Sequence, residues 1–217
     1  ADCLIMFNID YSAVSYFQAR ARLQTKDRTE VAKVYWLFAI GGIEEKIYKA
    51  VSEKKDWNTP PKYVAPVIKF FGGQVDLDPC SNAFSLINAT TNYILPTDGL
   101  QQVWNFKRIY INPPYGKNVD TDTSIYDWIN KANLANKEFG SEVLLLIPVA
   151  TNTKHFKDII FRNAKGICFL SDTRLKFWTD GKEDPKGAPM SCCMVYFGSD
   201  YVKFEKIFNS YGKCFEI

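Results

Sequence analysis

A turn built from asparagine, two prolines and tyrosine is the part of this sequence most suited to chemistry. Asn112, Pro113, Pro114 and Tyr115 directly follow the apolar run 108–111, which has the composition of a buried strand. The two prolines fix their φ angles and restrict the residue before each, so the turn is rigid. We therefore expect the Asn112 amide oxygen and the Pro113 carbonyl to face one point, where both accept hydrogen bonds from an amino group.

A pair of carbonyl acceptors suits the methylation of an exocyclic amine. Holding both N–H bonds frees the nitrogen lone pair from ring conjugation, which requires no general base, covalent nucleophile or metal ion. Tyr115 is expected to stack on the ring that carries the amine. The alternative for the same residues is a plain proline turn in which Asn112 is only the turn former.

Two acidic residues stand at predicted turns. Asp78 ends the strand-like run 75–78 and precedes Pro79, and Asp98 precedes Gly99 in a short turn. A carboxylate at the carboxyl end of a strand is well placed to accept hydrogen bonds from ribose hydroxyls or an ammonium group. The alternatives are an Asx turn or helix cap at Asp78 and an ordinary turn at Asp98.

Basic and aromatic residues are interleaved in the last quarter of the sequence. Arg174 and Lys176 alternate with hydrophobic residues, and Phe177 follows, in a pattern typical of the rim of a hairpin. Such a rim suits DNA phosphates and an unstacked base, so these three residues are candidate DNA contacts. Lys117, in the polar loop 116–124 after the proline turn, is a fourth candidate. The alternatives are core packing for Phe177 and a solvated surface loop around Lys117.

The elements that must position these residues alternate between strands and helices. Apolar runs typical of buried strands are separated by stretches of helical composition, which is the order of a wound α/β sheet. Strands are expected at 75–79, 108–111, 143–147, 166–170 and 192–197, and helices at about 62–71, 125–139 and 153–163. The single histidine, His155, is expected at the surface of the last of these helices.

From about Trp57 to Gly198 the sequence resembles the phage-type, Dam-like DNA N6-adenine methyltransferases. The motifs occur in the order of that family. They are 57–60 (Trp-Asn-Thr-Pro), 76–81 (Asp-Leu-Asp-Pro-Cys-Ser), 97–100 (Thr-Asp-Gly-Leu) ahead of Trp104, 112–115 (Asn-Pro-Pro-Tyr) and 146–148 (Leu-Ile-Pro). Methyltransferases in general have a Gly-x-Gly loop after the first strand, whereas this sequence and the phage family lack it.

The resemblance implies a Rossmann-like sheet with helices on both faces, S-adenosylmethionine as cofactor and double-stranded DNA as substrate. It implies that the target adenine is flipped out of the duplex and held by the catalytic residues Asn112, Pro113, Pro114 and Tyr115. Residues implied to bind the cofactor are Trp57, Thr59, Pro60, Asp78, Pro79, Cys80 and Asp98. Among them, Thr59 and Pro60 are expected at the methionine end and Asp98 at the adenine of the cofactor.

Other functions remain open from the sequence. Protein-glutamine N5 methylation requires the same acceptor pair for an amide nitrogen, although the 57–60 motif and the missing Gly-x-Gly loop disfavour it. Cytosine N4 methylation usually has serine in place of Asn112. An alternative of another class is a catalytically inactive DNA-binding module.

Residues 1–55 resemble the end of the second motor domain of a superfamily 2, Swi/Snf-like phage helicase. The match rests on Gln18, Arg22 and the stretch 34–47, while Thr25 stands where that family has a second arginine. The sequence has no Gly-x-x-x-x-Gly-Lys-Ser/Thr phosphate loop, so no ATPase is expected. We interpret the segment as a helicase remnant.

The same segment alternates two strand-like runs, 3–7 and 31–38, with two helix-like stretches, 15–24 and 43–50. A polar junction follows, and the composition then shifts toward proline, asparagine and threonine. The predicted domains are therefore residues 1–55, the helicase remnant, and residues 56–217, the DNA adenine methyltransferase domain.

Composition narrows the remaining possibilities. The net charge of +3 is small, so a DNA-binding surface must be a local basic patch. The six cysteines form no Cys-x-x-Cys pair and no histidine cluster accompanies them, so no metal site is expected. Without an apolar stretch that spans a bilayer, the sequence is interpreted as a cytoplasmic, phage- or prophage-encoded protein of a bacterial host, from a restriction-modification setting. No oligomeric state follows from it.

Overall fold

The structure, a computed structural model, describes residues 3–6, 33–36, 57–118, 121–179, 181–185 and 187–217. The chain divides into two compact units, Ala1–Lys55 and Asp56–Ile217. In the first unit, β1 (Cys3–Met6) pairs in parallel with β2 (Lys33–Trp36), and both strands lie inside runs expected to be strands. The helices expected at 15–24 and 43–50, with Gln18 and Arg22, lie outside the described residues, so the helicase resemblance stays a prediction.

The second unit is built on a seven-stranded sheet with the strand order β11-β7-β10-β6-β5-β3-β4. Its strands are β3 (Leu77–Asp78), β4 (Thr91–Asn92), β5 (Arg108–Ile111), β6 (Glu142–Pro148), β7 (Gly166–Leu170), β10 (Cys192–Phe197) and β11 (Gly212–Glu216). Strands β4, β3, β5 and β6 are parallel, β10 runs antiparallel between β6 and β7, and β11 is antiparallel to β7. The expected strands are present, and the edge strands β4 and β11 were not expected.

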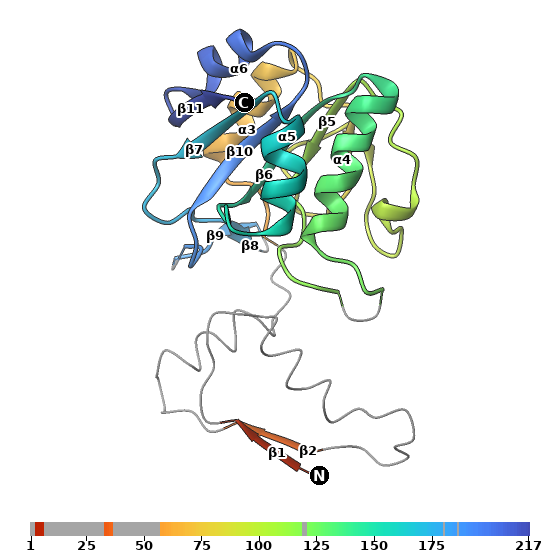
Figure 1. The fold of residues 1–217 in the computed structure, drawn as a ribbon, viewed down its shortest axis with the longest axis vertical. Coiled ribbons are helices and arrows are strands. Elements are labelled where there is room, and N and C mark those ends of the chain that lie inside the picture. The colour runs from red at the N-terminus through yellow and green to blue at the C-terminus, as the bar shows by residue number, and fades with distance from the viewer. Residues whose placement is uncertain (1–2, 7–32, 37–56, 119–120, 180, 186) are drawn as a thin grey trace. The chain divides into compact units, whose positions relative to one another are not determined.

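Helices cover both faces of this sheet (Figure 1). One face carries α3 (Pro61–Phe70) and α6 (Tyr201–Phe208), and the other carries α4 (Ile125–Phe139), the π-helical turn η2 (Phe156–Ile160) and α5 (Phe161–Asn163). The Rossmann-like α/β class predicted from the sequence is therefore confirmed.

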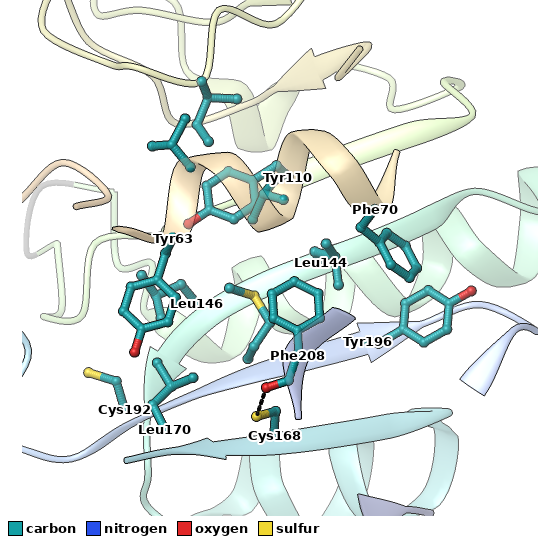
Figure 2. Close-up of a cluster of buried hydrophobic side chains, with 14 of the residues drawn as sticks. Tyr63, Phe70, Tyr110, Leu144, Leu146, Cys168, Leu170, Cys192, Tyr196 and Phe208 are labelled. Carbon is teal, nitrogen blue, oxygen red and sulfur yellow. Dashed lines mark hydrogen bonds between the residues drawn. The ribbon is translucent and has the colours of Figure 1, made fainter. Parts of the chain in front are cut away.

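Strand alternation divides the core into two clusters. Leu144 and Leu146 of β6 pack with residues of α3 and α6, as Figure 2 shows for part of this cluster. Their neighbours Val143, Leu145 and Ile147 face the opposite way and pack with α4 and η2. Because successive side chains of a strand point to opposite faces, an unbroken apolar run of this kind requires cover on both sides.

The ends of the helices follow local capping rules. Pro61 occupies the first turn of α3, where its missing N–H costs no hydrogen bond. Helix α4 begins with a capping box in which Ser124 and Asp127 bond each other's backbone, and it ends at Gly140 with φ of 68°. This start of α4 terminates the loop that follows the proline turn.

A small hairpin, β8 (Trp178–Thr179) paired with β9 (Lys182–Glu183), forms the rim expected in this region. The described part of the chain contains no helix long and apolar enough to cross a membrane. His155, expected at the surface, is instead buried at 8% exposed, because its ring packs beside Phe156 and its Nε2 lies 3.1 Å from the Thr153 hydroxyl.

Candidate active site

The side chain of Asn112 is held at the carboxyl end of β5 by two hydrogen bonds. Its Nδ2 donates to the backbone carbonyl of Trp57 at 2.6 Å, and its Oδ1 accepts from the Tyr115 hydroxyl at 3.1 Å. An amide that donates through nitrogen to a carbonyl has only one sensible orientation, because the reverse places two oxygens together. The Trp57 carbonyl therefore determines where the Asn112 acceptor oxygen lies.

The two prolines of the turn have different surroundings. Pro113 is buried and Pro114 is exposed. The turn thus passes from the interior at Pro113 to the surface at Pro114, next to the half-buried side chain of Tyr115. The acceptor role of the Pro113 carbonyl stays a prediction.

An aromatic cluster of Trp57, Tyr115 and Phe177 lies against this turn. The rings of Trp57 and Phe177 are parallel with centroids 5.0 Å apart, and Tyr115 meets them edge-on at 6.0 Å and 5.9 Å respectively. Phe177 is only 1% exposed, which favours the core-packing alternative, and its contact with DNA stays a prediction. Its apolar ring gains more from packing between Trp57 and Tyr115 than from solvent exposure.

The segment around Trp57 is also fastened through its backbone. Asn58 and Trp178 exchange two backbone hydrogen bonds, of 2.8 Å and 3.1 Å. The buried Thr59 hydroxyl lies 2.7 Å from the hydroxyl of Tyr110, and Pro60 is buried at the start of α3. Thr59 and Pro60 thus form a fixed wall, and their contact with a cofactor stays a prediction.

Asp78 is a buried carboxylate at the end of β3. Its Oδ1 accepts from the backbone N–H of Cys80 at 3.3 Å, and its Oδ2 accepts from the Ser85 hydroxyl at 3.2 Å. Burial raises the pKa of Asp78 from its ordinary 3.8 to about 6, and the hydrogen bonds from Cys80 and Ser85 limit the rise. The donors found around it among the described residues are neutral N–H, O–H and S–H groups.

Asp98 has a local structural role in this structure. Its Oδ1 accepts from the backbone N–H of Leu100 at 2.9 Å and starts the short 3₁₀ turn η1 (Gly99–Gln101). This is the turn that the sequence left open as an alternative. Gly99 lies so close to Pro79 that an added Cβ would be 1.8 Å from the Pro79 carbonyl oxygen, so the Asp78 and Asp98 loops are in direct contact.

The basic candidates are at the surface. Arg174 and Lys176 are exposed, whereas Leu175 and Phe177 between and after them are buried. Lys176 pairs with Glu183 at 3.0 Å. Lys117, also exposed, pairs with Asp122 at 2.5 Å. Because exposed and buried side chains alternate along this segment, Arg174 and Lys176 both face solvent, which suits contacts with DNA phosphates. These contacts stay predictions.

Several supporting residues were missed by sequence reasoning. Ser85 donates to Asp78, Tyr110 holds Thr59, and Trp178 pairs with Asn58. Tyr110 carried one usable signal, since a hydroxyl in an otherwise apolar strand requires a buried partner. The other two contacts depend on how distant loops fold together. Within the described part of the chain, no three His, Cys, Asp or Glu side chains group as metal ligands.

Comparison with protein families identifies the chain. A family model for DNA N-6-adenine-methyltransferase (Dam) matches residues 47–214, a range that contains every candidate site residue. Searches of curated proteins and of solved structures found no match. Since the match covers most of the chain and the turn after β5 carries the acceptor arrangement described above, the chain belongs to the DNA N-6-adenine-methyltransferase (Dam) family and is a DNA adenine-N6 methyltransferase.

Proposed function

We propose that the chain transfers the methyl group of S-adenosylmethionine to N6 of an adenine flipped out of double-stranded DNA, with Asn112 as the residue that holds the amine. The observation that carries the proposal is the 2.6 Å hydrogen bond from Asn112 Nδ2 to the Trp57 carbonyl. It leaves Oδ1 as the acceptor, at the carboxyl end of a central parallel strand, where open α/β sheets bind ligands.

The surroundings of Asp78 fit the proposed cofactor. A buried carboxylate whose donors in the described part of the chain are neutral is suited to an ammonium group or to ribose hydroxyls. Trp57 Nε1 is also buried and has no hydrogen-bond partner among the described residues, so an acceptor on a ligand would satisfy it. When bound, S-adenosylmethionine supplies an electrophilic methyl group on a positively charged sulfur. Asp78, Trp57, Thr59, Pro60, Pro79, Cys80 and Asp98 are the proposed residues around it.

On the adenine side, the chain supplies position and hydrogen-bond acceptors. Asn112 Oδ1 and the Pro113 carbonyl accept from the two N–H bonds of N6, which turns the nitrogen lone pair away from the ring. The rigid turn presents both acceptors without further ordering, so the reaction gains from proximity and orientation. Tyr115 and Pro114 form the wall beside the base.

The DNA backbone is proposed to contact Arg174, Lys176 and Lys117. Arg174 and Lys176 lie on the exposed side of a segment whose buried side, at Phe177, packs on Trp57. Phosphate contacts there would orient the duplex without reading its sequence.

Asn112→Ala tests the proposal. The purified chain is incubated with tritiated S-adenosylmethionine and unmethylated duplex DNA, and label in N6-methyl-2′-deoxyadenosine is measured after digestion to nucleosides. We expect the wild type to label adenine and Asn112→Ala to lose about a hundredfold to a thousandfold in rate, because one of the two acceptors is removed. Cofactor binding by calorimetry should be nearly unchanged.

A matched control is Asn209→Ala, at the exposed end of α6, which should keep the wild-type rate. A near-normal rate for Asn112→Ala would remove the assignment of Asn112. Label in protein instead of DNA would favour glutamine methylation, and a wild type that binds S-adenosylmethionine but labels nothing would indicate an inactive DNA-binding module.

A further inference from the structure

We infer that Cys80 is a positioning residue that holds the cofactor side of the site at a fixed distance from the adenine side. The inference rests on the proposed role of Asn112 and adds a residue that acts through it. Cys80 lies in the loop after β3, and Asn112 begins the turn after β5. Among the described residues, the Cys80 thiol is the side-chain group of the first loop that forms a hydrogen bond to the second loop.

The contact is a hydrogen bond from a side chain to a backbone carbonyl. Cys80 Sγ donates to the carbonyl oxygen of Asn112 at 3.2 Å, a short distance for a sulfur donor. The same sulfur is 3.8 Å from Asp78 Oδ1, and the Cys80 backbone N–H donates to that oxygen at 3.3 Å. Cys80 therefore contacts Asp78 through its backbone N–H and, at the longer distance, its thiol, whereas the shorter of the two thiol contacts is to Asn112.

The register of the sheet explains why these two residues meet. Leu77 of β3 pairs with Ile109 of the parallel strand β5. Cys80 is three positions beyond Leu77, and Asn112 is three positions beyond Ile109. The two residues thus leave the sheet at the same level on neighbouring strands, where a short side chain can span the gap.

Each loop is otherwise constrained on its far side. Pro79 fixes the backbone just before Cys80, and its carbonyl packs against Gly99, where an added Cβ would be 1.8 Å away. Asn112 is followed by Pro113 and held by the Trp57 carbonyl. The thiol joins two turns that are already rigid, so it sets their separation and not their shapes.

The thiol is in the form that this role requires. Burial and the negative charge of Asp78 raise the pKa of Cys80 well above its ordinary value. The group therefore stays protonated at neutral pH and keeps the hydrogen that it donates. A thiolate would repel both the Asn112 carbonyl and the Asp78 carboxylate.

Alanine and serine at position 80 separate positioning from packing. Cys80→Ala removes the donor, and we expect kcat to fall about tenfold to a hundredfold, because a small misplacement of reacting groups costs that much. The KM values for DNA and for S-adenosylmethionine should change less than about threefold. Cys80→Ser keeps an O–H donor of similar size and should restore most of kcat.

A matched control uses another thiol that donates to a backbone carbonyl. Cys168 Sγ, on β7, donates to the Phe208 carbonyl at 3.5 Å in the core cluster (Figure 2). Cys168→Ala should lower the melting temperature and leave kcat unchanged. Melting curves of both Cys80 variants show whether a change in rate follows from lost stability.

Three results would overturn the inference. An unchanged kcat in Cys80→Ala, with Asn112→Ala inactive, would reject it and keep the proposed function. A rise confined to the KM for S-adenosylmethionine would show that the Cys80 thiol serves only the cofactor contact already proposed, and equal losses in Ala and Ser variants with lowered melting temperature would make it a packing residue. Full activity of Asn112→Ala would instead reject the proposed function itself.

Discussion

The hydroxyl group of Tyr115 lies 3.1 Å from Oδ1 of Asn112, the atom proposed to accept a hydrogen bond from adenine. The same hydroxyl is 3.3 Å from the Leu146 carbonyl. Burial raises the pKa of Tyr115 well above its ordinary value, so the hydroxyl stays a donor at neutral pH. An incoming amino group therefore shares or replaces this bond when the base enters.

Tyr115→Phe should accordingly keep activity. The ring remains, the competing donor is lost, and the net worth of one such hydrogen bond is about 1 kcal/mol, so kcat and the KM for DNA should stay within about fivefold of wild type. Tyr115→Ala, which also removes the wall beside the base, should lose about a hundredfold. Steady-state kinetics on one duplex measure both. A Phe variant as inactive as Asn112→Ala would show that the hydroxyl takes part in the reaction.

Asp78→Asn should stabilise the ligand-free enzyme in a pH-dependent way. The pKa of Asp78 is raised from 3.8 to about 6, so the folded state favours the protonated form. That stabilisation is fully present below pH 4 and is lost as pH rises through about 6, which leaves a cost of up to about 3 kcal/mol at neutral pH. Urea unfolding at pH 7.5 should show the variant more stable, and the difference should vanish near pH 4.

The same carboxylate should make cofactor binding pH-dependent. Wild-type affinity for S-adenosylmethionine, measured by calorimetry, should weaken as pH falls below about 6, because Asp78 becomes protonated and loses its charge. Asp78→Asn should bind weakly throughout this range. An affinity that is flat with pH in the wild type would argue against Asp78 as a cofactor ligand.

Arg174→Ala and Lys176→Ala should each weaken DNA binding and reduce its salt dependence. A lost phosphate contact lowers the slope of log K against log salt by about one. The effect should be larger for Arg174, because Lys176 must first leave Glu183 at 3.0 Å. Fluorescence anisotropy at several salt concentrations measures the slope.

Two variants sharpen this test. Lys137→Ala is a control, since Lys137 is exposed in the last turn of α4. That turn lies near the start of β6, whereas the candidate site lies at the carboxyl ends of the parallel strands. This variant should leave the slope unchanged. Glu183→Gln should tighten binding, because it frees Lys176 and removes a negative charge near the phosphates. Equal slopes in all variants would place the DNA elsewhere on the chain.

Phe177→Leu should act on stability and not on the electrostatics of DNA binding. The ring is buried and parallel to Trp57, so its loss should cost about 1 kcal/mol or more of unfolding free energy. The salt slope should match that of wild type. A variant that has a normal melting temperature but binds DNA poorly would show that Phe177 contributes to the DNA interface.

The sequence by itself determined the class of the fold and the place of the acceptor turn. Strands such as β6 are unbroken apolar runs, and local sterics make their side chains alternate, so cover on both faces was predictable. Asn112 and Tyr115 could be placed at a strand end because the prolines between them interrupt any regular element. These features depend on residues within one turn or strand.

The tertiary structure decided which groups meet. Asn112 and the Trp57 carbonyl are 55 positions apart, and Cys80 and Asn112 are 32 apart, so no local pattern indicates either contact. The position of β10, antiparallel between β6 and β7, likewise depends on which strands pair, and no local pattern predicts that. The sequence likewise could not decide the environment of Phe177, since an aromatic residue beside basic ones suits both a DNA contact and the core. Only the packing of Trp57 against it decides, because burial depends on neighbours that are distant in the sequence.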